Sequence, residues 1–239
     1  MTQSEPEITE GQFEQVVYAS IAAWLALVGP AVFAIPKMPD LSAIFRFEQF
    51  WRRQVDSFTP YLVALARRGW RDGAEQAGIS TPFNPNDPYL LEALARTRNL
   101  LVRIPDETYR QIIKSVATGR DQGENAQQIR QRIDNVLTIT GSENWPNRAK
   151  VIARTELNRF YNAGVWSAGL KAQQARQVFK QWISRDDPRV RPTHVQADGQ
   201  RRRIGEPFEV GTSLLQQPQD PLGPAREVVN CRCRMRVVV

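Results

Sequence analysis

The sequence predicts an α+β fold, with a mainly α-helical body and a small β-containing end piece at the C-terminus. Apolar residues recur three or four positions apart through most of residues 10–175, which is the spacing of one helix face. From Val178 onward the chain has short β-branched or aromatic runs, and six prolines lie between residues 188 and 224. The 239 residues are 41% hydrophobic and 24% charged, a balance typical of folded globular chains.

The first predicted helix contains an uncharged stretch at residues 16–35. Its 20 residues reach the length of a membrane span, so a membrane-active segment is one interpretation. Gly29 and Pro30 interrupt the stretch, and the residues before it are acidic where a secretory signal requires positive charge. We expect a buried or partner-facing helix, with the membrane-active segment as the alternative.

The body continues with further helical segments. Residues 41–78 form an aromatic-rich segment that Pro60 should kink or break and Gly78 should end. A turn-rich stretch at 80–89 is followed by predicted helices at 90–102 and 105–118, by a glycine turn with a short helix up to residue 137, and by a long helix over 145–175. The glycine turn also suits a helix-turn-helix, although two packed helices joined in this way are common in all-α bundles.

Two strands are predicted in the end piece, at residues 178–184 and 233–239. Cys231 and Cys233 are the two cysteines of the chain, and in a strand their side chains would emerge on the same face. Two cysteines are too few for a disulfide framework, and a bridge between positions i and i+2 would be strained. A reducing compartment during synthesis is the simpler assumption.

The charge of the chain is uneven. The net charge of +7 divides into −4 over residues 1–40, +6 over 41–175 and +5 over 176–239. Such a surface suits non-specific, salt-sensitive contact with phosphates, and the triplet Arg201, Arg202 and Arg203 is the candidate DNA contact. Three arginines on an exposed turn are also commonly just solvated, so both interpretations stay open.

The chemistry-bearing residues gather in the last sixty positions. His194 is the one histidine, and with Cys231, Cys233 and the carboxylate of Asp187 it could form a tetrahedral zinc site. A thiolate beside arginines could instead act as the nucleophile of a thiol-dependent enzyme. In the third interpretation the cysteines are small buried hydrophobes and the other side chains hold loop backbone. We find no Gly-rich phosphate loop, paired-carboxylate signature, zinc-deaminase pattern or HExxH motif, which favours a protein that is not an enzyme.

Four segments in order resemble the phage Mu protein F-like family of head morphogenesis, or minor head, proteins. They are "ARTELNRFYNAG" at 153–164, "WISRDDPRVRPTH" at 182–194, "GEPF" at 205–208 and "NCRC" at 230–233, and the resemblance covers about residues 105–239. The family's motif positions fall on Arg154, Thr155, Glu156, Asn158, Trp182, Asp187, Arg189, His194, Asn230, Cys231 and Cys233.

The resemblance implies a structural virion protein of a tailed phage or prophage, present in several copies inside the capsid near the portal vertex. Its implied partners are the portal protein, capsid or scaffold proteins and, non-specifically, packaged double-stranded DNA, and it would aid procapsid assembly and genome packaging or delivery. It would be in the host cytoplasm during assembly. Some relatives are fused to toxin domains, and we expect no such C-terminal enzyme in this chain.

The predicted domains are therefore a helical N-terminal region at 1–104, which would dock on portal or capsid protein, and a Mu F-like domain at 105–239. Residues 176–239 form the β-containing end piece of that domain. Two alternatives remain: a thiol-dependent enzyme using Cys231 or Cys233 with His194, and a membrane-active ejection protein using residues 16–35, with transient membrane contact on ejection. No cofactor is expected unless the cluster binds zinc.

Overall fold

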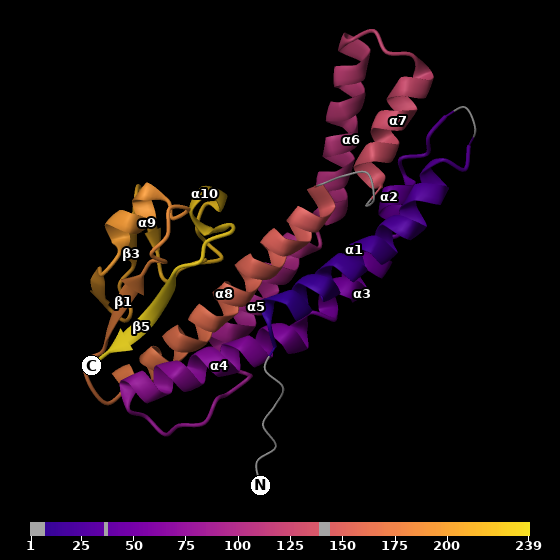
Figure 1. Ribbon diagram of the computed structural model, residues 1–239. Coiled ribbons are helices and arrows are strands. Elements are labelled where there is room, and N and C mark those ends of the chain that lie inside the picture. Colours follow the sequence, from indigo (N-terminus) through magenta and orange to yellow (C-terminus); the bar gives the residue numbers. More distant parts are fainter. Residues whose placement is uncertain (1–7, 36–37, 139–143) are drawn as a thin grey trace. The chain divides into compact units, whose positions relative to one another are not determined.

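The computed structural model describes residues 8–35, 38–138 and 144–239, and it confirms the α+β class (Figure 1). The helices of the body are α1 (Glu10–Val32), α2 (Ala43–Arg46), α3 (Glu48–Asp56), α4 (Thr59–Ala77), α5 (Pro88–Leu101), α6 (Ile104–Asp121), α7 (Ala126–Leu137) and α8 (Asn144–Gln173). The end piece contains β1 (Phe179–Ile183), α9 (Pro192–Ala197), β2 (Arg201–Arg203), β3 (Phe208–Val210), β4 (Ser213–Leu215), α10 (Ala225–Val228) and β5 (Arg234–Val238).

The chain divides into two compact units that do not follow the order of the sequence. Unit 1 comprises residues 1–14, 59–97 and 151–239, and unit 2 comprises residues 15–58 and 98–150. The predicted boundary between residues 104 and 105 falls in the first turn of α6, inside unit 2. That boundary was drawn from the sequence resemblance and stays a prediction.

Unit 2 is helical, and aromatic side chains fill its centre. Trp51 of α3 is fully buried, donates its indole N–H to the Leu101 carbonyl oxygen over 2.9 Å, and lies with its ring 6.0 Å from that of Trp24. In α7 the Asn125 side chain accepts from the backbone N–H of Gln128, whose side chain accepts in return, so a capping box fixes the start of the helix.

The apolar helix α1 buries one stripe of its surface. Val17, Ile21, Trp24, Val28 and Val32 recur at helical spacing and are all fully buried. By length and composition α1 is also the one helix of the described residues that could cross a membrane, a test that buried core helices pass as well. The burial of this stripe agrees with the expected buried helix.

In unit 1, α4 and α8 approach each other at glycines. A Cβ atom on Gly164 would lie 1.9 Å from the carbonyl oxygen of Ala66 and 2.6 Å from the backbone nitrogen of Trp70. A Cβ atom on Gly69 would lie 1.9 Å from the carbonyl oxygen of Tyr161. The two backbones therefore touch where neither helix carries a side chain.

A three-stranded antiparallel sheet in the order β2-β1-β5 lies in the end piece. Gln181 of β1 is opposite Arg201 on one side, and Trp182 is opposite Met235 on the other. Strands β3 and β4 form a separate hairpin whose turn begins at Gly211, with φ of 59°. Figure 1 shows this sheet and hairpin with α9 and α10 beside α8.

One apolar core joins the end piece to α8. Buried side chains from α8, the strands and the final segment pack together, among them Trp166, Val178, Trp182, Phe208 and Met235. Alternate residues of β1 and β5 point into this core, as expected for a sheet that buries one face.

Several predicted boundaries are confirmed. Pro60 lies in the first turn of α4, after a break from α3, and Gly78 follows the end of α4 with φ of 60°. The helices predicted at 90–102, 105–118 and 145–175 correspond to α5, α6 and α8.

Three local predictions are wrong. Helix α1 continues through Gly29 and Pro30 as far as Val32, so Pro30 lies in its last turn and only two helical residues follow it. Cys231 and Cys233 lie in an irregular segment that ends just before β5, although both side chains face inward as expected. Residues 201–203 form the edge strand β2 rather than a turn, because they pair with β1.

Candidate metal centre and the polar contacts around it

The structure brings together three of the four predicted metal ligands. His194 lies on α9, and the two cysteines lie in the segment between α10 and β5. The His194 Nδ1 atom is 3.3 Å from the Cys233 sulfur and 3.4 Å from the Cys231 sulfur. The ligand atoms lie within 4.8 Å of one another, and the three residues are 1–2% exposed. The cluster is thus a compact set of one nitrogen and two sulfur donors.

The other ring nitrogen of His194 faces a carboxylate. Nε2 lies 3.1 Å from Oε2 of the buried Glu227, and the Thr193 hydroxyl donates to the same oxygen over 2.9 Å. A carboxylate in this place favours the tautomer with the proton on Nε2, which leaves the Nδ1 lone pair directed at the sulfurs. Glu227 was not among the predicted ligands, and its position four residues before Cys231 is the signal in the sequence.

The two thiols affect each other. The hydrogen bond with Cys233 lowers the pKa of Cys231, while the same contact and burial raise the pKa of Cys233 above its usual range.

Asp187, the fourth predicted ligand, has a different partner. Its carboxylate accepts hydrogen bonds from Nη1 and Nη2 of Arg232, the second over 2.6 Å. It also accepts one from the Arg189 backbone N–H over 2.9 Å. The hydrogen bond from Arg232 lowers the pKa of Asp187 to about 2. Asp187 is outside the His–Cys cluster and holds residues 187–189 against the segment between the two cysteines.

Trp182 forms one wall of the cluster. Its ring meets the His194 imidazole edge to face at 5.5 Å and the Phe208 ring at 5.3 Å. The two contacts restrict the orientation of the imidazole from the side of the sheet.

On α8, the motif residues bind the segment that precedes the cysteines. The Arg154 guanidinium donates to Glu10 Oε1 over 3.0 Å and to Asn230 Oδ1 over 3.1 Å, and Thr155 Oγ1 accepts the Asn230 backbone N–H over 2.9 Å. Asn230 has φ of 57°, a left-handed conformation that asparagine adopts more readily than most residues. Asn158 has a local role, donating to the Arg154 carbonyl oxygen over 2.9 Å.

Glu156 belongs to a buried ion pair. It accepts from Arg159 Nη1 over 2.5 Å and from the Thr97 hydroxyl over 3.2 Å. Arg159 also donates to the Gln219 carbonyl oxygen over 3.0 Å. Burial raises the pKa of Glu156, and Arg159 opposes that shift. The pair thereby connects α8 to α5 and to the loop after β4.

The buried side-chain amide of Asn162 on α8 forms hydrogen bonds with the backbone beside the cluster. Asn162 accepts the Met235 N–H over 3.0 Å, and donates to Gln219 Oε1 over 2.7 Å and to the Cys233 carbonyl oxygen over 3.3 Å. Gln219 has φ of 59° and donates to the same Cys233 carbonyl. Arg159, Asn162 and Gln219 were not among the predicted site residues, although the first two lie inside the segment "ARTELNRFYNAG".

Comparison with known proteins shows the family of the chain. The sequence pattern of the family described as "Phage Mu protein F like protein" matches residues 110–236, more than half of the chain. The chain belongs to this family. It is 26% identical over 133 residues to "Minor head protein GP7" of Bacillus phage SPP1, and the alignment covers 56% of this chain and 42% of that protein. The chain thus spans less than half of this relative's length. No solved structure matches the chain.

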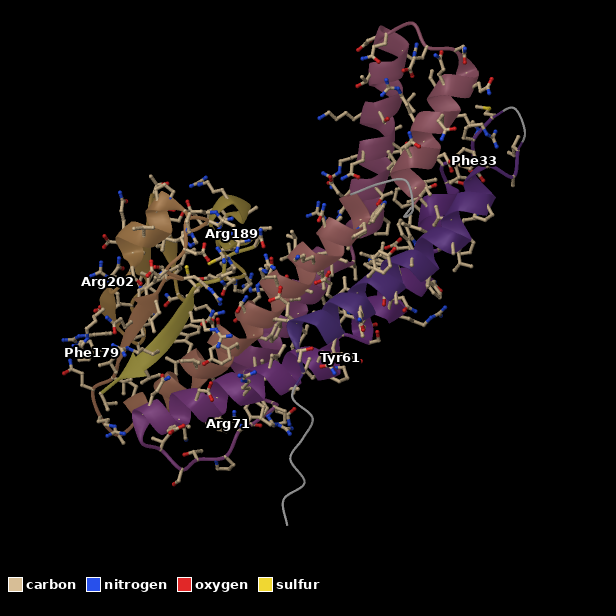
Figure 2. The ribbon with its side chains drawn as sticks, in the orientation of Figure 1. Phe33, Tyr61, Arg71, Phe179, Arg189 and Arg202 are labelled. Atoms are coloured by element: carbon tan, nitrogen blue, oxygen red, sulfur yellow. The ribbon has the colours of Figure 1, made fainter. Side chains whose placement is uncertain are left out.

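The Mu F-like region contains all eleven predicted motif residues. Most of them have described contacts within unit 1, either at the His–Cys cluster or between α8 and the final segment. Arg189, labelled on the end piece in Figure 2, differs because its side chain is exposed.

The three predicted DNA-contact arginines lie along β2, at the edge of the sheet. Arg202, labelled in Figure 2, pairs with Glu209 over 2.8 Å. The Arg201 guanidinium lies 5.2 Å from the centre of the Phe179 ring, and Arg203 is exposed. Arg201 and Arg203 therefore present their charge to solvent more freely than Arg202.

The Mu F-like region also buries Lys180. Its ammonium group donates to the Gln216 carbonyl oxygen over 2.6 Å and lies 4.9 Å from the Phe208 ring centre. Burial lowers the pKa of Lys180 to about 7, although Asp220 and Glu206 oppose the shift. Lys180 was not among the residues predicted from the sequence.

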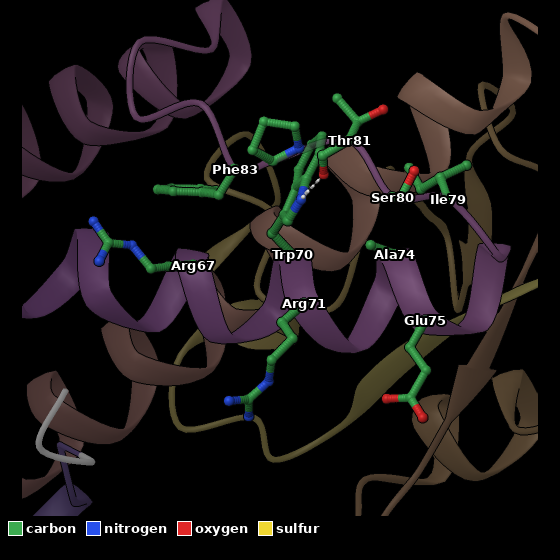
Figure 3. A pocket seen from close by; sticks show the side chains of 10 residues that line it. Arg67, Trp70, Arg71, Ala74, Glu75, Ile79, Ser80, Thr81 and Phe83 are labelled. Carbon is green, nitrogen blue, oxygen red and sulfur yellow. Dashed lines mark hydrogen bonds between the residues drawn. The ribbon is translucent and has the colours of Figure 1, made fainter. Parts of the chain in front are cut away.

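A surface hollow of about 390 Å³ lies outside the family match, between α4 and the loop that follows it (Figure 3). Trp70 lies across it and donates its indole N–H to the Thr81 carbonyl oxygen over 3.2 Å, with Phe83 beside it. Arg67 and Arg71 are among the residues that line it. None of the His–Cys cluster residues lines this hollow.

Proposed function

We propose that this chain is a minor head protein, a structural component of a phage particle that takes part in head morphogenesis. The family match over residues 110–236 carries this proposal, and the similarity to the SPP1 minor head protein supports it.

The contacts of the motif residues favour a structural role over an enzymatic one. Thr155, Glu156, His194 and both cysteines are buried, and their polar atoms contact other parts of the same unit. A thiol nucleophile requires access for its substrate, whereas Cys231 and Cys233 are 2% exposed. Particles that lose infectivity with Cys231→Ser/Cys233→Ser, while assembling normally, would favour the thiol-dependent enzyme instead.

The proposed location is the capsid interior near the portal vertex, with several copies per particle and a period in the host cytoplasm during assembly. Residues 1–104 would dock on portal or capsid protein. The experiment is co-purification of the tagged full chain with portal protein and procapsids, together with localisation of the tag in particles. Recovery with procapsids and absence from tail fractions is the expected result. A chain that is missing from both procapsids and finished virions would contradict the proposal.

DNA contact is proposed as a separate, electrostatic property of the basic surface. The salt dependence of binding to a non-specific DNA duplex tests it, because each phosphate contact contributes about 0.9 to the log–log slope. Arg201→Gln/Arg203→Gln should lower that slope. The matched control, Arg71→Gln/Arg110→Gln, removes two exposed positive charges elsewhere. Equal slopes for both double variants would show that β2 is not the contact.

Membrane activity on ejection is the second candidate, and the length and composition of α1 favour it. Flotation of the full chain with liposomes distinguishes the two candidates, because a helix whose apolar stripe stays buried should not float.

A further inference from the structure

We propose that His194 Nδ1 and the sulfurs of Cys231 and Cys233 bind a zinc ion, which fastens α9 to the segment ahead of β5. The inference rests on the geometry of the cluster and is independent of where the protein lies in a particle.

The donor atoms already have the spacing of a zinc centre. With Zn–S of about 2.3 Å and Zn–N of about 2.0–2.1 Å, tetrahedral geometry places neighbouring nitrogen and sulfur ligands about 3.5 Å apart. The two nitrogen–sulfur distances are 3.3 and 3.4 Å. The two nitrogen–sulfur distances therefore need to change by only a few tenths of an ångström to accept an ion, and all three donor atoms lie within 4.8 Å of one another. One imidazole with two thiolates is a donor set that favours zinc over magnesium or calcium.

The histidine is oriented as metal-bound histidines usually are. Glu227 lies against Nε2 and is itself held by the Thr193 hydroxyl, so that Nδ1 faces the sulfurs, and Trp182 packs against the ring. Metal-ligating histidines almost always donate their second ring N–H to a carboxylate, a carbonyl or water, and this partner affects metal affinity. A buried carboxylate behind the imidazole is a second observation that points to a metal, independent of the three donors.

The three side chains account for three positions of a tetrahedral site. Among the described residues, no further histidine, cysteine or carboxylate supplies a fourth ligand to the cluster. A water molecule is the expected fourth ligand, and the deep burial of the donors suits an ion that stabilises the fold. The alternative is a metal-free network in which a thiol hydrogen-bonds to Nδ1.

The experiment uses the full chain purified under reducing conditions, stripped with a chelator and reloaded with zinc. Elemental analysis should find about one zinc per chain, and zinc should raise the melting temperature of the stripped protein. Cobalt(II) in place of zinc should give thiolate-to-cobalt charge-transfer absorption. Retention of less than about a tenth of an equivalent, with no effect of zinc on melting, would overturn the proposal in favour of the metal-free network.

The variants separate the ligands from their neighbours. Cys231→Ser and Cys233→Ser should each lose the cobalt absorption of one thiolate and most of the zinc. Glu227→Gln should retain zinc with affinity lower by about 10–100-fold. Asp187→Asn is the matched control and should bind zinc as the wild type does, because Asp187 pairs with Arg232. Loss of zinc in Asp187→Asn but not in the cysteine variants would overturn the assignment. If the cysteine variants do not fold, the cobalt spectrum and the melting shift of the wild type still decide whether the cluster binds zinc.

Discussion

Gly164→Ala is the sharpest test of how unit 1 is packed. The added Cβ atom would lie 1.9 Å from the Ala66 carbonyl oxygen, well inside the 3.0 Å that real Cβ contacts essentially never cross. The obstructing atoms are backbone atoms of α4, so no side-chain rotation relieves the contact, and the two helices must separate.

The expected magnitude follows from two opposing effects. Overfilling a packed core costs about 1–3 kcal/mol and occasionally more, and backbone obstruction places this site at the upper end. Replacing glycine by alanine inside a helix returns about 1 kcal/mol. We therefore expect the free energy of unfolding to fall by about 2 kcal/mol or more. For a chain of this size, that loss corresponds to a melting temperature lower by about 4–8 °C.

Chemical and thermal denaturation of the full chain measures this effect. Gly29→Ala is the matched control, because Gly29 is also helical and its added Cβ would meet nothing within 4 Å. The control should be neutral or slightly stabilising. A Gly164→Ala variant as stable as the control would refute the close approach of α4 and α8.

Three further predictions concern polar groups of unit 1. Asn162→Ala leaves buried backbone and amide groups without a partner and should lower the free energy of unfolding by about 2–4 kcal/mol, measured by denaturation. The paired Asp187 should stabilise the fold above about pH 4, and this contribution should disappear as pH falls from 3.8, its ordinary pKa, towards 2, as measured by melting temperature against pH. Between about pH 7 and 10.5 the unfolded chain holds a proton that buried Lys180 has released, so stability should rise with pH across this window in denaturation experiments.

The predictions for Asn162, Asp187 and Lys180 each have a control. Asn158→Ala removes a single hydrogen bond on the same helix and should cost less than about 1.5 kcal/mol. Asp187→Asn should remove the part of the acid dependence assigned to the pair with Arg232, and an unchanged acid profile would contradict that assignment. Lys180→Met should flatten the alkaline rise; a rise that persists undiminished would show that other groups cause it.

The sequence predicted those parts of the fold that depend on local signals. Pro60 and Gly78 mark helix boundaries through their own backbone preferences, and the apolar spacing around Ile21 and Trp24 identifies a buried face. The prediction that Pro30 interrupts the first helix was wrong, because the effect of a proline depends on its place in the helix. The position of Pro30 in the last turn of α1 is not visible in the sequence.

The candidate site was only partly predictable. The residue types of His194, Cys231 and Cys233 indicated metal chemistry, but the carboxylate predicted as the fourth ligand was Asp187, and the one that contacts the histidine is Glu227. An arginine close in space decides the role of Asp187, and no periodicity reveals that contact. The sequence also does not reveal that the missing side chain of Gly164 admits the backbone of α4.

The discontinuity of unit 1 has a consequence for biosynthesis. Its contacts join residues far apart along the chain: Glu10 to Arg154, 144 positions apart, and Gln76 to Val237, 161 positions apart. Contacts of such separation form slowly, while the α6–α7 hairpin of unit 2 joins neighbouring segments. During translation the hairpin would therefore be complete long before residues 231–238 leave the ribosome. An assembly partner that recognises folded unit 1 would therefore bind only after residues 231–238 have been synthesised, and later than a partner that recognises the α6–α7 hairpin.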